Sequence, residues 1–427
     1  MHANPYLFFN NLKFSKLQIQ IPLTSHLKGH HYDGFFHGQE AGNRSPTSGR
    51  SHGQPVEMPL MGKLLLAGTG HAHLSIIQSI PDLIARGHEV TAISPGERHF
   101  YSSMGPGMLG GIYKSEEISF PVREMVERRG GTFIRNKVVS IEAENRSVTL
   151  ESGEKLFYDV LSCNLGSTIP RNIITKGSAG VFPVKPIENL FSARQFIIAR
   201  AARQKVNVGI CGGGPAAVEI AGNALAAGME RGGRGCRVQI FTQGHLLRTL
   251  PEKVRRLAET RLKKGGVEIF QGNIVQSIDT RLIRLKNGKA YAQDIIFLAT
   301  GVHPPTIFAD SNLEVGKDGA LLVNRYLRTP RYPEIFGGGD CIWFTPRPLK
   351  KVGVYPVRQN PILRHNLLAK LERKPMQPFD PGGAYLVGLN LGGGYGIINK
   401  SFLTIGGRTA FFIKDRIDRK FMRKFRS

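Results

Sequence analysis

The sequence has 427 residues, 41% of them hydrophobic and 21% charged, and this size and composition predict a globular protein of two or three domains. Lysine plus arginine outnumber aspartate plus glutamate by 58 to 32, a formal net charge of +26, which favours anionic partners such as a phosphorylated cofactor or an anionic membrane surface. The sequence shows no nucleic-acid-binding motif and no long apolar run, so we expect neither a nucleic-acid partner nor a transmembrane helix.

The first 60 residues differ in character from the rest of the chain. They are rich in His, Gly and Asn, show no steady period and hold six of the 13 histidines. A secretory signal needs a longer apolar core, and a transit peptide usually carries more Arg and Ser. We therefore expect residues 1–60 to be a disordered or non-native N-terminal extension, with Met61 as the alternative start.

The first structured segment reads as a β-α-β unit. Residues 63–68 form a short apolar strand, followed by a glycine loop, a helix reaching about residue 85 and a second strand at 88–93. Gly68 and Gly70 fill the first two positions of the dinucleotide fingerprint, in which glycines allow a tight turn and a close approach to a pyrophosphate. This loop is a candidate nucleotide site.

The loop departs from the fingerprint at two points. His73 stands at the third glycine position, and Ser94 ends the second strand where an acidic residue normally binds a ribose hydroxyl. Glu97, three residues further on, is a substitute for that acid. Taken alone, the first loop is therefore weak evidence for nucleotide binding.

A second β-α-β unit begins about 144 residues later and has a cleaner loop. Its strand, helix and strand are expected at residues 206–211, 215–230 and 237–241. Gly212, Gly214 and Ala217 satisfy the form GxGxxA directly between strand and helix. Glu219 lies in the first turns of that helix, where the helix dipole alone would also favour a carboxylate. No acidic residue ends the second strand, so a choice between NADH and NADPH stays open.

Other segments complete the pattern. Hairpin-like pieces are expected between the two units at residues 131–139, 147–150 and 155–161. A strand at 294–298 leads into Gly301, and a glycine run leads into Asp340, whose carboxylate can accept a hydrogen bond from a ribitol hydroxyl. The four glycine segments, in this order, are stronger evidence together than any one alone.

The chain ends in a basic amphipathic segment. Residues 408–426 hold eight Lys or Arg against two Asp, while Ile413, Ile417, Phe421 and Phe425 recur at a spacing of four. That pattern predicts a helix with one apolar face. It fits a helix lying on a membrane surface and fits equally a helix docked on the protein's own core.

Five segments of the sequence resemble the two-dinucleotide flavoprotein family, also called pyridine nucleotide–disulfide oxidoreductases. The chain is most similar to the type II NADH dehydrogenase branch, and within it to the domain fused to some selenophosphate synthetases. The segments that carry the resemblance are residues 68–73, 101–107, 160–167, 352–359 and 414–422.

The resemblance implies an α/β fold with two Rossmann-like dinucleotide-binding domains and a C-terminal segment. An FAD domain at 61–170 and 298–370 would be interrupted by an NAD(P)H domain at 171–297. Residues 371–427 would form a C-terminal domain with the basic tail.

The resemblance also implies which residues serve each cofactor. Glu219 would lie near the nicotinamide end as a positioning residue. The residues expected to bind FAD are Gly68, Gly70, His71, Ala72, Ser94, Ser102, Pro106, Val139, Gly166, Asp340, Tyr355 and Gln359. Those expected at the nicotinamide cofactor are Gly212, Gly214 and Ala217, with Gly301 crossing near a cofactor.

The implied function is an FAD-dependent NAD(P)H dehydrogenase that passes electrons on to a quinone-type acceptor. Disulfide reductases of the family carry a cysteine pair where this chain reads Tyr101-Ser-Ser-Met104, so electrons cannot leave through a dithiol there. Cys163 and Cys341 are the only candidates for a sulfur-donor oxidoreductase, and each is better explained as a small buried residue. The other alternative is a flavin-binding sensor without turnover.

The cysteines and the family resemblance also predict where the protein is located and how it assembles. None of the four cysteines forms a close pair, so we expect no disulfide scaffold and no metal site, and a cytoplasmic location fits. The type II branch meets quinone at membranes, so a peripheral position on the cytoplasmic membrane face is the further expectation. A homodimer is among the expected assemblies.

Overall fold

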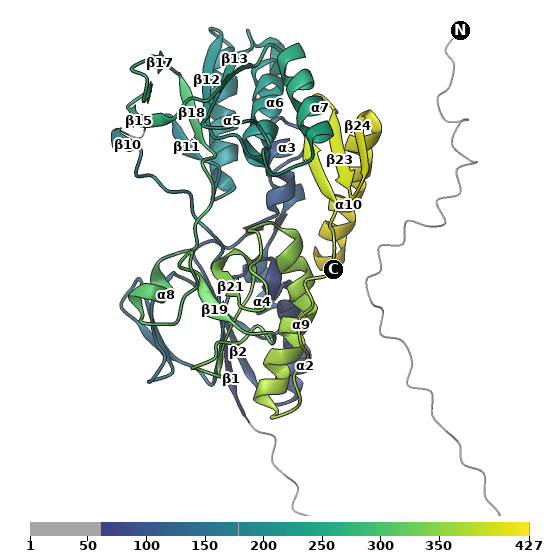
Figure 1. Ribbon diagram of the computed structural model, residues 1–427. Helices are drawn as coiled ribbons and strands as arrows, with labels where there is room; N and C mark the ends of the chain where they lie inside the picture. The colour runs from purple at the N-terminus through teal and green to yellow at the C-terminus, as the bar shows by residue number, and fades with distance from the viewer. Residues whose placement is uncertain (1–60, 178, 427) are drawn as a thin grey trace, which may run out of the picture. The chain divides into compact units, whose positions relative to one another are not determined.

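The computed structural model describes residues 61–177 and 179–426. The extension expected at residues 1–60 lies outside the described residues. Two five-stranded sheets organise the described chain, and each is parallel throughout with helices against it (Figure 1). The fold is therefore mixed α/β, as expected.

The first sheet has the strand order β20-β9-β1-β2-β5. Its strands are β1 (Lys63–Ala67), β2 (Glu89–Ser94), β5 (Thr132–Arg135), β9 (Val160–Cys163) and β20 (Ile335–Gly337). All neighbours pair in parallel. The chain passes from β1 to its neighbour β2 on one side, while β9 pairs with β1 on the other side. The strand order therefore reverses beside β1. Nucleotides bind at such a reversal, outside the carboxyl ends of the strands.

The helix expected after the first loop is interrupted. The chain forms η2 (His71–His73), α1 (Leu74–Gln78) and α2 (Ile80–Ala85), with Ser79 between the two α-helices. Pro81 occupies the first turn of α2, a position that tolerates proline because its missing N–H would have no partner there. Proline inside one continuous helix would instead remove a hydrogen bond, which explains the break.

Two of the three expected hairpin pieces each contain a strand that belongs to no hairpin. The piece at 131–139 supplies β5, which pairs in parallel with β2, and the piece at 155–161 ends in β9, which pairs in parallel with β1. The antiparallel meander in this part of the chain consists of β6 (Val138–Glu142), β7 (Ser147–Leu150) and β8 (Lys155–Phe157). Local alternation of residues indicates a strand but cannot reveal a parallel partner far away in the sequence.

The second sheet has the order β11-β18-β12-β13-β14. Its strands are β11 (Val181–Pro183), β12 (Val206–Cys211), β13 (Cys236–Thr242), β14 (Glu268–Gln271) and β18 (Ile295–Leu298). All four pairings are parallel. Here the order reverses between β12 and β18, which places the second candidate nucleotide site at their carboxyl ends.

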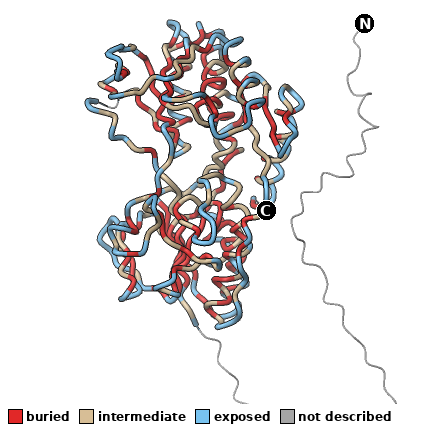
Figure 2. The backbone as a smooth tube through the Cα atoms, in the orientation of Figure 1, coloured by how far each residue is buried: buried red, intermediate tan, exposed pale blue. Residues whose placement is uncertain are grey.

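Helices cover both sheets and bury their strands. The second sheet is packed by α5 (Glu188–Ala201) and α6 (Pro215–Gly228), and α9 (Val354–Leu371) packs against the first. Helix α7 (Glu252–Lys264) packs on α6. Four of the five residues of β1 and five of the six of β12 are buried, and Figure 2 shows buried segments running through the middle of both sheets. Such near-continuous burial is typical of parallel sheets covered on both faces.

The remaining elements are short. They are β3 (His99–Phe100), η3 (Ser102–Met104), α3 (Gly105–Leu109), η4 (Glu116–Ile118), β4 (Ser119–Phe120), α4 (Val122–Glu127), β6 (Val138–Glu142), β7 (Ser147–Leu150), β8 (Lys155–Phe157), β10 (Ile174–Lys176), η5 (Glu230–Gly232), β15 (Val275–Asp279), β16 (Leu282–Leu285), β17 (Ala290–Ala292), α8 (Ile307–Asp310), β19 (Leu321–Val323), η6 (Gly339–Cys341) and β21 (Ile342–Phe344). Within the described ranges, no helix combines the length and the apolar character needed to cross a bilayer.

The C-terminal segment is a three-stranded antiparallel sheet followed by a helix. The strands are β22 (Val387–Asn390), β23 (Gly396–Lys400) and β24 (Leu403–Gly407), and α10 (Arg408–Arg426) packs on them. In Figure 1 α10 runs alongside β23 toward the C-terminus.

The buried face of α10 differs from the expected one. Its buried residues are Ala410, Lys414, Asp418, Met422 and Phe425. The expected stripe of Ile413, Ile417 and Phe421 is only partly buried, and Phe425 alone belongs to both sets. The helix is rotated because Lys414 and Asp418 pair with each other at 2.7 Å, which allows two charged side chains to face inward.

Candidate functional site

The first glycine loop packs against Asn164, which directly follows β9. Gly68 has φ +89°, and a Cβ there would lie 2.3 Å from the Asn164 carbonyl oxygen. A Cβ on Gly70 would lie 1.8 Å from Asn164 Oδ1, while Asn164 Nδ2 donates to the Gly338 carbonyl at 2.9 Å. Both glycines are therefore needed for this close packing. Asn164 was not among the expected site residues, although it lies within the segment 160–167.

His73 explains why the third glycine is absent. Its side chain is fully buried, with Nδ1 2.6 Å from the Gly68 carbonyl and Nε2 2.8 Å from Ser162 Oγ. Burial lowers the pKa of His73 to about 4, although the contact with Gly68 opposes this. A neutral imidazole therefore ties the loop to β9, where a glycine would provide only room.

His71 places an aromatic cluster beside the loop. Its Nδ1 lies 2.9 Å from His99 Nε2, and its ring packs against Tyr101 and Phe421. Burial, with Lys185 nearby, lowers the pKa of His71 to about 4. Its Nε2 is buried and has no hydrogen-bond partner among the described residues. Ala72 is buried next to Gly338, whose missing side chain makes room for it.

Asp340 lies in a small charged cluster close to the first loop. Its Oδ2 accepts from Lys185 Nζ and from Ser167 Oγ, both at 2.7 Å, and Ser167 follows Gly166, which has φ +71°. Burial would raise the pKa of Asp340, but Lys185 outweighs it and the pKa is lowered. Asp340 is therefore ionised. Lys185 was missed in the sequence because it lies outside every motif.

The first turns of α9 reach the same place. Gln359 Oε1 accepts from the Gly339 backbone N–H at 2.7 Å. Its Nε2 is buried and lacks a hydrogen-bond partner in the described part of the chain. Tyr355, one turn earlier, packs its ring on Tyr385. A buried amide donor without a protein partner points to a polar ligand at this position.

The other expected FAD residues are placed less tightly. Ser94 is buried at the end of β2, and its carbonyl accepts from the Asn136 N–H at 3.2 Å, just ahead of β6. Val139 is exposed on β6. Ser102 in η3 and Pro106 in α3 lie on the segment that packs against α6.

The second loop lies between β12 and α6. Gly212 has φ +134°, and a Cβ there would lie 2.1 Å from the Ala299 carbonyl oxygen just after β18. Gly214, the first residue before α6, has no neighbouring atom within 4 Å of an added Cβ, while Ala217 is fully buried. Gly301 has φ +109° and is exposed. The loop thus leaves open space at the amino end of α6, where backbone N–H groups attract phosphate.

Glu219 is held by the C-terminal segment. Its Oε1 accepts from the Asn390 N–H of β22 at 2.8 Å, and it does not cap α6. Burial raises the pKa of Glu219 to about 7, with Lys414 opposing the rise. The helix-dipole explanation of Glu219 therefore accounts for little, because its carboxylate is engaged by another element.

Cys163 and Cys341 are poorly suited to act as nucleophiles. Cys163 and Cys341 are fully buried and unpaired, with Cys341 Sγ 3.5 Å from the Cys163 carbonyl. Burial raises the pKa of Cys163 well above its usual range and that of Cys341 to about 11. Thiols of this kind are not ionised near neutral pH. No cluster of metal-ligating side chains occurs in residues 61–177 and 179–426.

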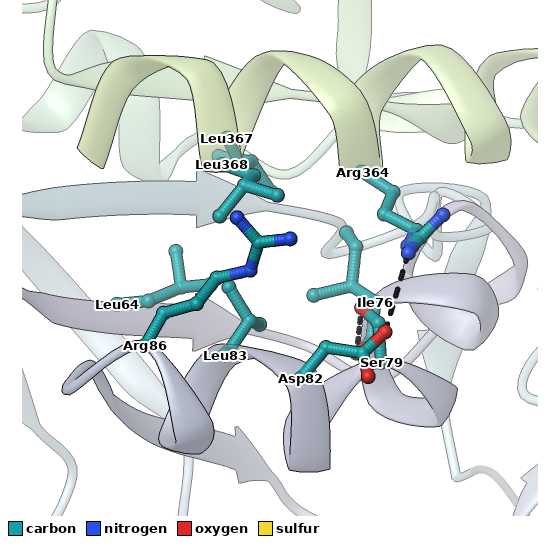
Figure 3. A pocket seen from close by; sticks show the side chains of 9 residues that line it. All are labelled: Leu64, Ile76, Ser79, Asp82, Leu83, Arg86, Arg364, Leu367 and Leu368. Atoms are coloured by element: carbon teal, nitrogen blue, oxygen red, sulfur yellow. Dashed lines mark hydrogen bonds and ion pairs between the residues drawn. The ribbon is translucent and has the colours of Figure 1, made fainter. Parts of the chain in front are cut away.

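Two hollows lie away from the glycine loops. A cavity of about 20 Å³, room for about one water, lies between α1, α2 and α9 and includes the Arg364–Asp82 ion pair (Figure 3). Its lining residues are Leu64, Ile76, Ser79, Asp82, Leu83, Arg86, Arg364, Leu367 and Leu368. A shallower hollow of about 410 Å³ lies at the amino ends of β12, β13 and β14, the opposite edge from the loops. Neither coincides with the candidate site.

Two parallel sheets, each with a glycine loop at its strand-order reversal, define a protein with two dinucleotide-binding units. Residues 63–361 match the pyridine nucleotide-disulphide oxidoreductase family, and the chain belongs to that family. FAD and NAD(P)H are the cofactors of the family, and the charged cluster at Asp340 and the open helix end at Gly214 are the features that fit them.

The chain is similar to curated and solved proteins along most of its length. It is 25% identical to ferroptosis suppressor protein 1 of Taeniopygia guttata over 70% of this chain and 79% of that one. It is 23% identical to an external alternative NAD(P)H-ubiquinone oxidoreductase of Solanum tuberosum mitochondria, over 65% and 55% of the two chains.

Two solved structures share the fold. The sulfide:quinone oxidoreductase of Aquifex aeolicus superposes with a TM-score of 0.70 at 18% identity, over 86% of this chain and 91% of that one. The Plasmodium falciparum protein NDH2, solved in complex with NADH, gives a TM-score of 0.68 at 14% identity, over 85% and 99%.

Proposed function

We propose that this chain is an FAD-dependent NAD(P)H dehydrogenase that delivers electrons to a quinone-type acceptor. Residues 61–170 and 298–370 hold FAD, residues 171–297 hold NAD(P)H, and residues 371–427 form the C-terminal domain. When bound, FAD supplies the acceptor for a hydride from the nicotinamide, chemistry that side chains cannot perform. The chain's own residues bind and orient the two cofactors.

One observation carries the proposal. The same three features occur twice, namely a parallel sheet, a reversal of strand order and a glycine loop at the carboxyl end of the central strand. Near the first loop, Lys185 and Ser167 hold Asp340 ionised, and the Gln359 amide keeps a free donor. A carboxylate beside an amide donor suits the hydroxyls and carbonyls of a flavin dinucleotide. Similarity to the NAD(P)H-ubiquinone oxidoreductase supports the proposed quinone-type acceptor.

Replacement of Gly214 by Val tests the assignment of the second loop. An added Cβ meets no protein atom within 4 Å, so the variant should fold, but its branched side chain would occupy the space in front of α6 where the pyrophosphate belongs. We expect the purified variant to keep its flavin absorbance and to lose bleaching by NADH and NADPH. Turnover with NAD(P)H at the wild-type rate in this variant would contradict the assignment.

The acceptor requires a separate test. The flavin, once reduced under anaerobic conditions, should be reoxidised rapidly by a soluble ubiquinone analogue. Reduction by sulfide in place of NAD(P)H, and loss of that reaction on replacing Cys163 and Cys341 by Ser, would favour the sulfur-donor alternative. Flavin that neither donor reduces would favour a sensor without turnover. The burial of both thiols argues against the sulfur-donor alternative.

We also propose that the C-terminal domain contacts a membrane surface. Phe402 is 96% exposed at the turn between β23 and β24, next to Leu403, and Phe412 is 59% exposed on α10. Exposed phenylalanines on a strongly basic chain suit insertion into an anionic bilayer, each contributing about 1.5–3 kcal/mol. The variant Phe402→Ser/Phe412→Ser should bind phosphatidylglycerol vesicles at least about tenfold more weakly than wild type. Unchanged binding would contradict this location of the contact.

A further inference from the structure

Helix α10 carries an ion pair into the interior. Lys414 and Asp418 are 5% and 3% exposed. Lys414 Nζ donates to Asp418 Oδ2 at 2.7 Å, to the Ser103 carbonyl at 2.8 Å and to Ser103 Oγ at 3.0 Å. Asp418 Oδ1 accepts from the hydroxyls of Tyr101 at 3.1 Å and Ser103 at 3.0 Å. All three ammonium protons are used, so the pair is held in one geometry.

Glycines bring this pair close to Glu219. A Cβ on Gly388 of β22 would lie 3.2 Å from Lys414 Cγ, so the stem of Lys414 lies on that glycine. Two residues later, Asn390 donates its N–H to Glu219. Directly after β22, the Leu391 carbonyl oxygen would lie 2.1 Å from a Cβ on Gly222 of α6. The chain therefore packs α6, β22 and α10 tightly around the Glu219 carboxyl.

The charges around Glu219 do not balance. Two carboxyl groups, Glu219 and Asp418, share the single cation of Lys414. Neither α3 nor β22 contributes a titratable side chain, as their sequences GPGML and VGLN show. Tyr101 is neutral, because burial and Asp418 raise its pKa. With both carboxyl groups ionised, this buried cluster would carry one excess negative charge, which favours a proton on one of the two carboxyl groups.

A second set of charges, from α10 and η4, lies nearer the solvent than this cluster. Asp415 accepts from the hydroxyl of Tyr113 at 2.7 Å and pairs with Arg419 at 3.0 Å, and Arg419 also reaches Glu117. Asp415 and Glu117 both pair with Arg419, and the three side chains are partly exposed to solvent, which screens their effect on Glu219. Asp415 provides a matched control on the same helix.

We propose that Lys414 and Asp418 are positioning residues for Glu219, which act from the C-terminal helix to decide whether its carboxyl holds a proton and so tune the NAD(P)H site. The last part of the proposal rests on the proposed function, since it takes Glu219 as part of that site. The two residues act in opposite directions, because removing the cation favours the protonated carboxyl and removing the anion favours the ionised one.

The infrared band of protonated carboxyl groups measures this directly in the FAD-loaded protein, without NAD(P)H. We expect a band that titrates near neutral pH in the wild type, where burial raises the pKa of Glu219 to about 7, and that disappears in Glu219→Gln. Its midpoint should rise by about one pH unit or more in Lys414→Met and fall in Asp418→Asn, stay near the wild-type value in Lys414→Arg and be unchanged in Asp415→Asn. The pH midpoint of NADH affinity, measured by flavin fluorescence, should follow the infrared midpoint in each variant.

Shifts in the same direction, or no shift, in Lys414→Met and Asp418→Asn would show a merely structural role and overturn the proposal. If Lys414→Met fails to fold, the downward shift in Asp418→Asn and the unchanged value in Lys414→Arg decide. Infrared shifts in opposite directions without any binding of NADH or NADPH would refute the proposed function and leave the charge coupling standing. NADH affinity that is independent of pH in the wild type would overturn the link to the donor site.

Discussion

At the scale of single residues, the two outer glycines of the second loop serve different purposes. Gly212 adopts φ +134° against the Ala299 carbonyl, whereas Gly214 has φ −83° and open space. Gly212→Ala should therefore lower the free energy of unfolding by about 1–3 kcal/mol, because the backbone must shift and adopt a strained conformation. Gly214→Ala should change it by less than about 0.5 kcal/mol. Urea denaturation measures both, and equal losses would contradict the account.

His73 should make the fold sensitive to acid. Its pKa is about 4 in the folded chain, against 6.5 for an exposed histidine, with burial as the main cause. Between these values the unfolded chain binds more protons, so the contribution of His73 is complete above about pH 6.5 and is lost as the pH falls toward 4. The loss amounts to about 3 kcal/mol.

Urea denaturation between pH 7 and 4.5 tests that expectation. His73→Gln cannot titrate, so its stability should start lower but fall less steeply with acid than that of the wild type. Equal slopes in the two proteins would show that His73 is not the responsible group.

What the sequence revealed at this scale depended on motifs. Gly68, Gly70, Gly212 and Gly214 could be found because a fixed spacing marks them. Asn164 and Lys185 could not, because their roles arise only when the ends of β9 and β11 come beside the first loop. His73 was recognised as a departure, but its bond to Ser162 depends on a pairing 89 residues away.

At the scale of secondary structure elements, α10 should stabilise the fold through its last turn. Phe425 is 2% exposed and packs on Phe120 and Phe421, so Phe425→Ala should cost about 3 kcal/mol of unfolding free energy. Phe412→Ala on the same helix should cost less than about 0.5 kcal/mol, since its ring is mostly in solvent. Thermal or urea unfolding distinguishes them, and a negligible cost for Phe425 would mean that α10 does not dock as described.

The same helix shows the limit of periodicity as a guide. Spacing alone identified a helix at residues 408–426, and its bounds agree with the structure. Periodicity could not reveal that Lys414 and Asp418 turn inward, because their burial depends on partners in Tyr101 and Ser103 from another part of the chain. Strands β5 and β9 were misread for a related reason, since their parallel neighbours are distant in sequence.

At the scale of the whole molecule, the order of the two β-α-β units and the mixed α/β fold followed from the sequence, and the sheets confirm them. The contact of the C-terminal domain with Glu219 could not be predicted from the sequence, because it depends on how β22 and α10 pack around α6. In the proposed function, the FAD domain, the NAD(P)H domain and the C-terminal domain therefore all contribute to one hydride donor site.

Anaerobic titration of the purified protein with NADH, and then with NADPH, would show whether the chain takes a hydride from a nicotinamide donor. We expect a flavin chromophore that copurifies with the chain and bleaches on addition of about one equivalent of at least one of these donors. A flavin that stays oxidised with both donors would contradict the account, because the second glycine loop would then not be a working hydride site.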